Sequence, residues 1–343
     1  MADALTAVLR TVRLQGSIFF GAEAQGAWGM AFPQSSPELG VAFHTVRRGR
    51  CVARVHGATK RELELEAGDL VLFPRGTPHD LVDTTTTSAE PIAELVARHG
   101  SRPRNEPMRL GAGGPTTTLL CGYFVTRAPE RDAHPLLSVL PDLVLVRGTG
   151  GRASAWLESL LALIDEETRA ALPGSETVVD RLTEALFIRI VRAWLSEESE
   201  RAPSWIAALS DVSLARVLGL IHGSPAHPWT VDELARRAGV SRSGLAAHFR
   251  EKVGEPPMHY LARWRMQLAA HQLEDPDVAL VEVAERVGYH AEEAFSRAFK
   301  RFWSEAPGAW RRRHARRAAR GEHTAMQPFP AAAQPASLRS PPS

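Results

Sequence analysis

The side chains that could do chemistry in this chain fall into two groups, one in each half of the sequence. Near the C-terminus, polar, basic and small residues recur on one side of two predicted helices. The first helix carries Arg242, Ser243, Ala246, Ala247 and Arg250, and the second, with its preceding turn, carries His290, Glu292, Glu293, Ser296, Arg297 and Lys300. Such side chains can bond base edges and phosphates or touch a thymine methyl group. This group therefore indicates DNA binding.

An internal repeat positions these two helices. Residues 234–240 (LARRAGV) match residues 283–289 (VAERVGY), and each copy has a small Ala followed, after three residues, by Gly. The Ala lets a second helix cross closely, and the Gly takes the positive φ that a tight turn between two helices demands. Each copy therefore predicts a helix-turn-helix unit.

The helix after each Gly shows the spacing of a buried apolar face. The inward residues are predicted to be Leu245, Phe249 and Val253 in the first unit and Phe295, Phe299 and Phe302 in the second. Thr230 and Glu233 form a candidate capping box, and Ser241 is a candidate N-cap. A long helix over residues 258–273 would separate the two recognition helices by about 34 Å if both read one face of the duplex.

Charge along the chain supports the same interpretation. Residues 206–320 hold 18 basic and 13 acidic residues, whereas residues 1–205 hold 22 and 25. A basic half indicates an anionic partner, although a helical bundle with solvated charges is the plainer alternative. After Trp310, five arginines are expected to contact phosphates, and these are Arg311, Arg312, Arg313, Arg316 and Arg317.

The C-terminal half resembles the AraC/XylS regulators. The resemblance covers about residues 210–314 and rests on residues 222–225, 228–249, 257–266, 283–289, 294–301 and 307–308. It implies a seven-helix domain that inserts two helices into successive major grooves of double-stranded DNA. Three features depart from the family. Ala291 replaces a capping residue, Ser304 replaces a common Gly, and Ala246 and Ala247 replace long polar side chains.

The second group of candidate residues lies in the N-terminal half. Residues 68–79 (GDLVLFPRGTPH) predict a strand that turns sharply at Pro and Gly and then presents His79 to an interior. This pattern resembles the second cupin motif, with Asp83 where that motif often has Asn. Of the first cupin motif only His44 remains. The resemblance covers about residues 12–145 and implies a small barrel that senses a ligand, so His44 and His79 are predicted to bind an unknown small effector.

A metal at His44 and His79 is the alternative to a metal-free pocket. Protein sites for divalent metals usually take three or more ligands. Only Cys121 or His134 could be a third, and nothing in the sequence supports either. We therefore expect no cofactor and no metal, with hydrogen-bonded histidines lining the pocket. The two cysteines, Cys51 and Cys121, are expected to be inert core residues.

The pattern of apolar residues outlines the rest of the chain. Strands are expected at residues 41–45, 51–55, 69–73 and 119–126. Two helices follow at residues 153–164 and 178–196, with Trp156, Leu160, Leu163 and Ile164 as the stripe of the first. Residues 197–203 are the candidate linker. The tail after residue 321 is rich in Pro, Ala and Ser and is expected to be disordered.

Composition excludes some classes of protein. No stretch reaches the roughly 18 uncharged apolar residues of a membrane span, and residues 1–14 do not read as a signal peptide. We therefore expect a cytoplasmic protein with no membrane partner. Its two cysteines cannot form a disulfide framework.

Together these patterns predict an α+β protein with four segments. Residues 1–150 form a cupin-like β-barrel that binds the effector, residues 151–205 a helical dimerisation and linker segment, residues 206–320 the double helix-turn-helix domain, and residues 321–343 the tail. The predicted function is a sequence-specific transcription regulator, a homodimer that meets RNA polymerase at a promoter. Two rivals stay open: a metal-dependent cupin enzyme fused to a DNA-binding domain, and a DNA-compacting protein without an effector.

Overall fold

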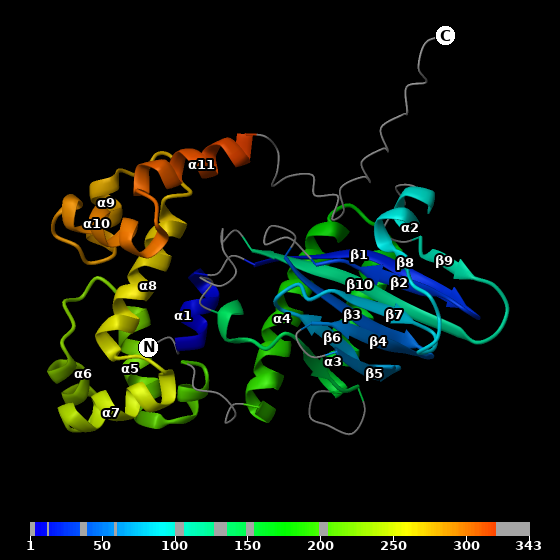
Figure 1. Ribbon diagram of the computed structural model, residues 1–343, viewed down its shortest axis with the longest axis horizontal. Helices are drawn as coiled ribbons and strands as arrows, with labels where there is room; N and C mark the ends of the chain where they lie inside the picture. The colour runs from blue at the N-terminus through cyan, green and yellow to red at the C-terminus, as the bar shows by residue number, and fades with distance from the viewer. Residues whose placement is uncertain are drawn as a thin grey trace, which may run out of the picture.

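A β-rich N-terminal part and a helical C-terminal part make up the protein, as the computed structural model shows (Figure 1). The structure describes residues 4–11, 14–34, 40–57, 60–99, 106–126, 136–148, 154–198 and 205–319. Within these residues the fold class predicted from the sequence, a cupin-like region followed by two helices and then a helical domain, is confirmed.

The N-terminal part contains two sheets. Their strands are β1 (Leu14–Gln25), β2 (Gly29–Phe32), β3 (Val41–Arg48), β4 (Arg50–His56), β5 (Lys60–Glu66), β6 (Leu70–Phe73), β7 (His79–Val82), β8 (Glu90–Pro91), β9 (Met108–Gly111), β10 (Thr116–Thr126) and β11 (Val144–Val146). One sheet has the order β11-β6-β3-β10-β1-β9 and the other the order β5-β4-β7-β2-β8. Apolar side chains from both sheets form one core between them. The four strands predicted from the sequence overlap β3, β4, β6 and β10.

The sheets are separate in the described part of the chain, whereas the sequence predicted a barrel. Tight turns explain the arrangement. Gly26 (φ 63°) and Gly49 (φ 78°) follow β1 and β3, and each sends the chain into the facing sheet. The strands before and after each of these two turns therefore lie in different sheets, and no ladder in the described residues joins the sheet edges into a closed barrel.

Two helices cover the outer face of the six-stranded sheet. They are α3 (Ser154–Ala170) and α4 (Ser175–Glu198), and α4 crosses β1 closely. At the crossing, a Cβ on Gly16 would stand 2.6 Å from Thr183 Cγ2, so only Gly fits there. The predicted stripe on α3 is wrong at Leu163, which is 49% exposed, because Leu157, Leu161 and Ile164 face the sheet instead.

The C-terminal part has seven helices among the described residues. They are α5 (Val212–Gly223), α6 (Val231–Ala238), α7 (Arg242–Val253), α8 (Pro257–Gln272), α9 (Leu280–Arg286), α10 (Glu292–Trp303) and α11 (Pro307–Ala319). Helix α8 contributes to two cores. Leu261 and Trp264 pack with the first helix-turn-helix unit, and Met266 and Ala269 pack with the second. One continuous helix therefore holds both units.

Two short helices complete the fold. Helix α1 (Ala4–Thr11) packs against α5 and lies between the two parts of the protein, whereas α2 (Ile92–His99) packs beside β2 and β8 (Figure 1). None of the described helices has the length and apolar character needed to cross a bilayer. The predicted linker overlaps the end of α4 at residues 197–198, and the rest of it, like the tail, lies outside the described residues. The boundaries at residues 150, 205 and 320 stay predictions.

Candidate functional site

The two helix-turn-helix units share the turn geometry that the repeat predicts. Gly239 ends α6 with φ 76°, and Gly288 follows α9 with φ 83°, so both residues are left-handed. In the second unit, close packing around Gly288 adds a further constraint. A Cβ on Gly288 would meet the Ala226 carbonyl oxygen at 2.7 Å and a guanidinium nitrogen of Arg265 at 2.8 Å. The predicted requirement for Gly at both turns is confirmed.

The helix starts of the first unit are capped. Ser241 Oγ accepts from the backbone N–H of Gly244 at 3.1 Å, and Thr230 Oγ1 accepts from that of Glu233 at 3.2 Å. The Glu233 carboxylate bonds His227 and Arg237 instead of returning to Thr230, so only half of the predicted capping box forms. The hydrogen bond from His227 lowers the pKa of Glu233. These caps fix where α6 and α7 begin.

Helix α7 presents the predicted polar face to solvent. Leu245, Phe249 and Val253 are buried as predicted. The candidate contact residues Arg242, Ser243, Ala247 and Arg250 are exposed, and Ala246 is half-buried. Arg242 reaches back to Asp232 at 3.2 Å, an exposed ion pair that a phosphate could replace. Small side chains thus occupy the centre of the exposed face.

A hydrogen bond between side chains ties α7 to α5. Asp211 is the N-cap of α5, and its Oδ1 accepts from the backbone N–H groups of Ser213 and Leu214. Its Oδ2 accepts from His248 Nε2 of α7 at 2.9 Å. The hydrogen bond from His248 is the main cause that lowers the pKa of Asp211. One carboxylate therefore fixes α7 against α5.

Helix α10 presents the second set of candidate residues. His290, Glu292, Glu293, Arg297 and Lys300 are exposed, and Ser296 is half-buried. Ala291 makes no side-chain cap, and Ser304 ends the helix in the left-handed region at φ 57°.

The buried face of α10 corrects one prediction. Phe295 and Phe299 are buried as predicted, but Phe302 is 36% exposed. Trp303 and Trp310 pack with their ring centroids 4.6 Å apart and fill the core at this end, and the Phe302 ring lies edge-on to Trp303. Trp303 Nε1 also donates to the Met266 carbonyl oxygen of α8 at 3.2 Å.

The arginines of α11 divide into two kinds. Arg311 donates to the Val278 carbonyl oxygen at 2.6 Å, and Arg313 pairs with Glu305 at 2.8 Å. Arg312 and Arg316 are exposed and make no ion pair within the described residues. Arg311 therefore holds α11 to the loop before α9, and the expectation that it contacts a phosphate stays a prediction. The Arg317 side chain lies outside the described ones.

The two predicted effector histidines bond each other in the core between the sheets. His44 Nε2 and His79 Nε2 are 2.8 Å apart, and both side chains are buried. His79 Nδ1 donates to the Thr77 carbonyl oxygen, so in the neutral pair His44 Nε2 is the donor to His79. The rings of Phe73 and His79 stack at 3.6 Å. Burial lowers the pKa of His79 to about 4 and that of His44 well below its usual value.

A metal site does not form around this pair in the described part of the chain. No group of three or more His, Cys, Asp or Glu side chains there could hold an ion. Burial raises the pKa of the Cys51 thiol to about 12 and that of the Cys121 thiol well above its usual value, as expected for inert core cysteines. His134 lies outside the described residues.

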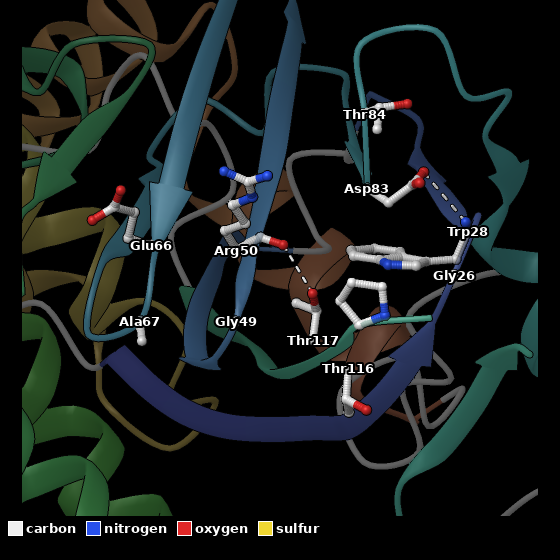
Figure 2. Close-up of a pocket in the computed structure, with 11 residues that line it drawn as sticks. Gly26, Trp28, Gly49, Arg50, Glu66, Ala67, Asp83, Thr84, Thr116 and Thr117 are labelled. Carbon is white, nitrogen blue, oxygen red and sulfur yellow. Dashed lines mark hydrogen bonds between the residues drawn. The ribbon is translucent and has the colours of Figure 1, made fainter. Parts of the chain in front are cut away.

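A cavity of about 790 Å³ opens at one end of the two sheets (Figure 2). It lies where β1, β3, β5 and β7 end and where β10 begins, and its lining includes Trp28, Arg50, Glu66, Asp83, Thr84 and Thr117. Neither His44 nor His79 is among the lining residues. Of the lining residues, only Asp83 belongs to a motif recognised in the sequence, so the site was not predicted. The sequence signal that could have indicated it is a set of turns that contain Gly, such as those at Gly26 and Gly49, which the fold brings together.

Hydrogen bonds between the turns hold the cavity wall. Thr117 Oγ1 donates to the Arg50 carbonyl oxygen at 2.8 Å. Asp83 and Trp28 bond in both directions, since the Asp83 N–H donates to the Trp28 carbonyl oxygen at 3.1 Å and Asp83 Oδ1 accepts from the Trp28 N–H at 3.4 Å. The lining side chains therefore stand on a connected frame.

Comparison with known proteins agrees with both halves of the structure. Residues 3–196 match the family described as Cupin, and residues 234–313 match the family described as Helix-turn-helix domain. An AraC-like transcription regulator of Streptomyces antibioticus is 33% identical over 311 residues, which cover 90% of this chain and 98% of that protein. The HTH-type transcriptional regulator AlkR of Acinetobacter baylyi is 30% identical over 313 residues, or 90% and 99% of the two chains.

Among solved structures, the DNA-binding domain of AdpA in complex with a target DNA is 31% identical and covers 32% of this chain and 96% of its own, with a TM-score of 0.29. The curated relatives are named as regulators, so the enzyme alternative finds no support among them. The chain therefore belongs to the AraC-like family of DNA-binding transcription regulators, with a cupin domain followed by a helix-turn-helix domain.

Proposed function

We propose that this regulator reads promoter DNA with α7 and α10, and that a small molecule in the cavity changes this binding. The observation that carries the proposal is the pair of exposed helix faces, which follow turns of the same left-handed geometry and are held by one helix, α8. Two recognition helices on one rigid element suit two successive major grooves.

The two helices are proposed to read DNA differently. On α10, Arg297 reads guanine or clamps a phosphate, while Glu292 and Glu293 accept from cytosine or complement the helix dipole. His290, Ser296 and Lys300 flank them. On α7, Ala246 and Ala247 touch thymine methyl groups, and Arg242, Ser243 and Arg250 bond phosphates or base edges. Fewer direct base contacts are therefore expected in the half-site of α7.

Helix α1 supports coupling between the cavity and the DNA-binding part. Val8 is fully buried, and Leu5 and Leu9 pack with the core that includes α5 (Figure 1). Strand β1 begins three residues after α1 and ends at Gln25, directly before Gly26 in the cavity wall. An effector that shifts the Gly26 turn can therefore shift α1 against α5, which favours one arrangement of the two parts. The open cavity also argues against a DNA-compacting protein without an effector.

The assembly belongs to the same proposal. Leu163, Leu172 and Val178 on the hairpin of α3 and α4 are 49%, 64% and 42% exposed, and an apolar surface of this kind supports a homodimer. A dimer bound at a promoter lies within reach of RNA polymerase, which we include as a partner. Because bacterial promoters lie in the cytoplasm, the proposal includes a cytoplasmic location for this protein.

The test is selection of binding sites by the full-length protein from a library of random DNA sequences. We expect enrichment of two conserved blocks with centres about 10–10.5 base pairs apart, the spacing of two major grooves on one face. An Arg98→Ala variant, changed on α2, should select the same blocks. A single block, or no enrichment with folded protein, would contradict the proposed docking.

A further inference from the structure

We infer that the cavity takes a small amphoteric organic molecule with a flat apolar body, which gives an anionic or acceptor group to Arg50 and a hydrogen-bond donor to Asp83. The inference rests on the proposed effector role of this cavity and names the chemistry of its ligand. It follows from one aromatic side chain and two opposite charges on the lining.

Arg50 supplies the cationic side of the cavity. Its side chain is exposed, and its guanidinium makes no ion pair with the described residues. Its cross-strand neighbour on β5 is Glu66, but Figure 2 shows the Glu66 carboxylate pointing away from it. The hydrogen bond of 2.8 Å from Thr117 Oγ1 to the Arg50 carbonyl oxygen fixes the Arg50 backbone. A guanidinium that offers a planar fork of donors matches a carboxylate of a ligand.

Asp83 supplies the acceptor on the other side. Figure 2 shows the Asp83 side chain beside Trp28, across the cavity from Arg50. Oδ1 accepts from the Trp28 N–H at 3.4 Å, whereas Oδ2 has no hydrogen bond within the described residues. An ionised carboxylate only accepts, so this oxygen is available to a donor such as an amine or hydroxyl on the ligand.

Trp28 supplies a rigid apolar wall. Its side chain is 4% exposed and packs in the core between the two sheets, so its position does not depend on the ligand. An indole beside polar groups favours a flat body in van der Waals contact. The volume of about 790 Å³ falls within the range of pockets for ligands of a few hundred daltons.

The balance of charges decides the class of ligand. A simple anion bound to Arg50 would also face the carboxylate of Asp83, and a simple cation bound to Asp83 would face Arg50. A molecule with both groups compensates both sides of the cavity. It is therefore favoured over an organic acid, an organic amine or an uncharged polyol.

The experiment measures binding of 3- and 4-(aminomethyl)benzoate to the full-length protein by calorimetry and by NMR of the probe. Benzoate and benzylamine, each of which carries half of the pattern, are the comparison probes, and myo-inositol represents uncharged polyols. We expect at least one zwitterionic probe to bind about tenfold or more tightly than either half, since each charged hydrogen bond contributes about tenfold or more.

Two variants assign the contacts. Arg50→Gln should lower the affinity of the preferred zwitterion to that of benzylamine, and Asp83→Asn should lower it to that of benzoate. Asn keeps the oxygen that accepts from Trp28, so the turn is preserved. Arg61→Gln, an exposed change on β5 away from the cavity, is the matched control and should leave the affinity unchanged.

Equal binding of the zwitterions and their halves, or tighter binding of myo-inositol, would overturn the inferred ligand class. No binding of any probe to protein that still selects its two DNA blocks would also overturn it, while the DNA-binding proposal would stand. Loss of DNA selection with normal probe binding would contradict the proposed function instead.

Discussion

At the residue scale, Arg297 carries the most specific prediction for DNA recognition. It lies on the exposed face of α10, two residues from each of the buried Phe295 and Phe299. A bidentate contact to guanine contributes about 1–3 kcal/mol of discrimination. Arg297→Ala should therefore remove discrimination at one base position and keep it elsewhere, measured with single-base operator variants at fixed salt.

Two other outcomes for Arg297→Ala have separate meanings. A uniform loss of affinity at every operator variant would make Arg297 a phosphate contact. Unchanged binding by a folded variant would mean that α10 does not enter the groove.

His44 and His79 predict how stability depends on pH. Burial lowers the pKa of His79 to about 4, and that of His44 is lowered as well, whereas a histidine in the unfolded chain titrates near 6.5. Between these values the unfolded chain binds more protons than the folded one. The free energy of unfolding should therefore fall as pH decreases from about 6.5 toward 4, by up to about 1.4 kcal/mol per pH unit for each histidine.

Urea unfolding at pH 7, 6 and 5 measures this dependence. A His79→Asn variant should be less stable at pH 7, because a buried ring and its bond to His44 are lost, and it should show a weaker dependence on pH. If the variant kept the full pH dependence of the parent protein, the buried pair would not be its source.

At the scale of single elements, α10 lacks a cap that α7 has. Ala291 adopts φ −130° and ψ 131°, an extended conformation that a Ser N-cap also adopts, but it makes no cap bond. Ala291→Ser should raise the free energy of unfolding by about 1 kcal/mol in urea. The reverse change, Ser241→Ala before α7, should lower it by a similar amount. A destabilised Ala291→Ser variant would contradict this view of the α10 start.

Helix α11 predicts a sequence-independent share of DNA affinity. Each phosphate contact by Arg312 or Arg316 adds about one counterion to the salt dependence. Ala at either position should weaken specific and nonspecific binding alike and reduce the salt slope by about 1. Arg313→Ala is the matched control, because its guanidinium is already paired with Glu305 at 2.8 Å. A loss of specific binding alone, with the slope unchanged, would refute the assignment.

At the scale of the whole molecule, the hairpin of α3 and α4 predicts the oligomeric state. The double change Leu163→Lys and Leu172→Lys places charge on side chains that are 49% and 64% exposed, so folding should be kept and self-association weakened at least tenfold. Analytical ultracentrifugation measures the change. Val281→Lys, at a site 48% exposed on α9, should leave the dimer intact. A double variant as dimeric as the parent would place the interface elsewhere.

The sequence by itself determined the helical half, because its signals act over a few residues. Left-handed glycines at positions 239 and 288, the caps at Thr230 and Ser241, and the spacing of Leu245 and Phe249 are local properties, and the structure confirms each. The strand–turn pattern before His79 was equally local and placed His79 in an interior correctly.

Only the tertiary structure decided which interior His79 enters and where the cavity lies. The bond between His44 and His79 joins residues 35 apart, and the cavity wall draws on turns from Gly26 to Thr117. Packing also determines that Leu161 and not Leu163 is buried on α3, and that Arg311 donates to the Val278 carbonyl oxygen. These outcomes depend on which surfaces meet after the chain has folded, and contacts of that range leave no periodic signal in the sequence.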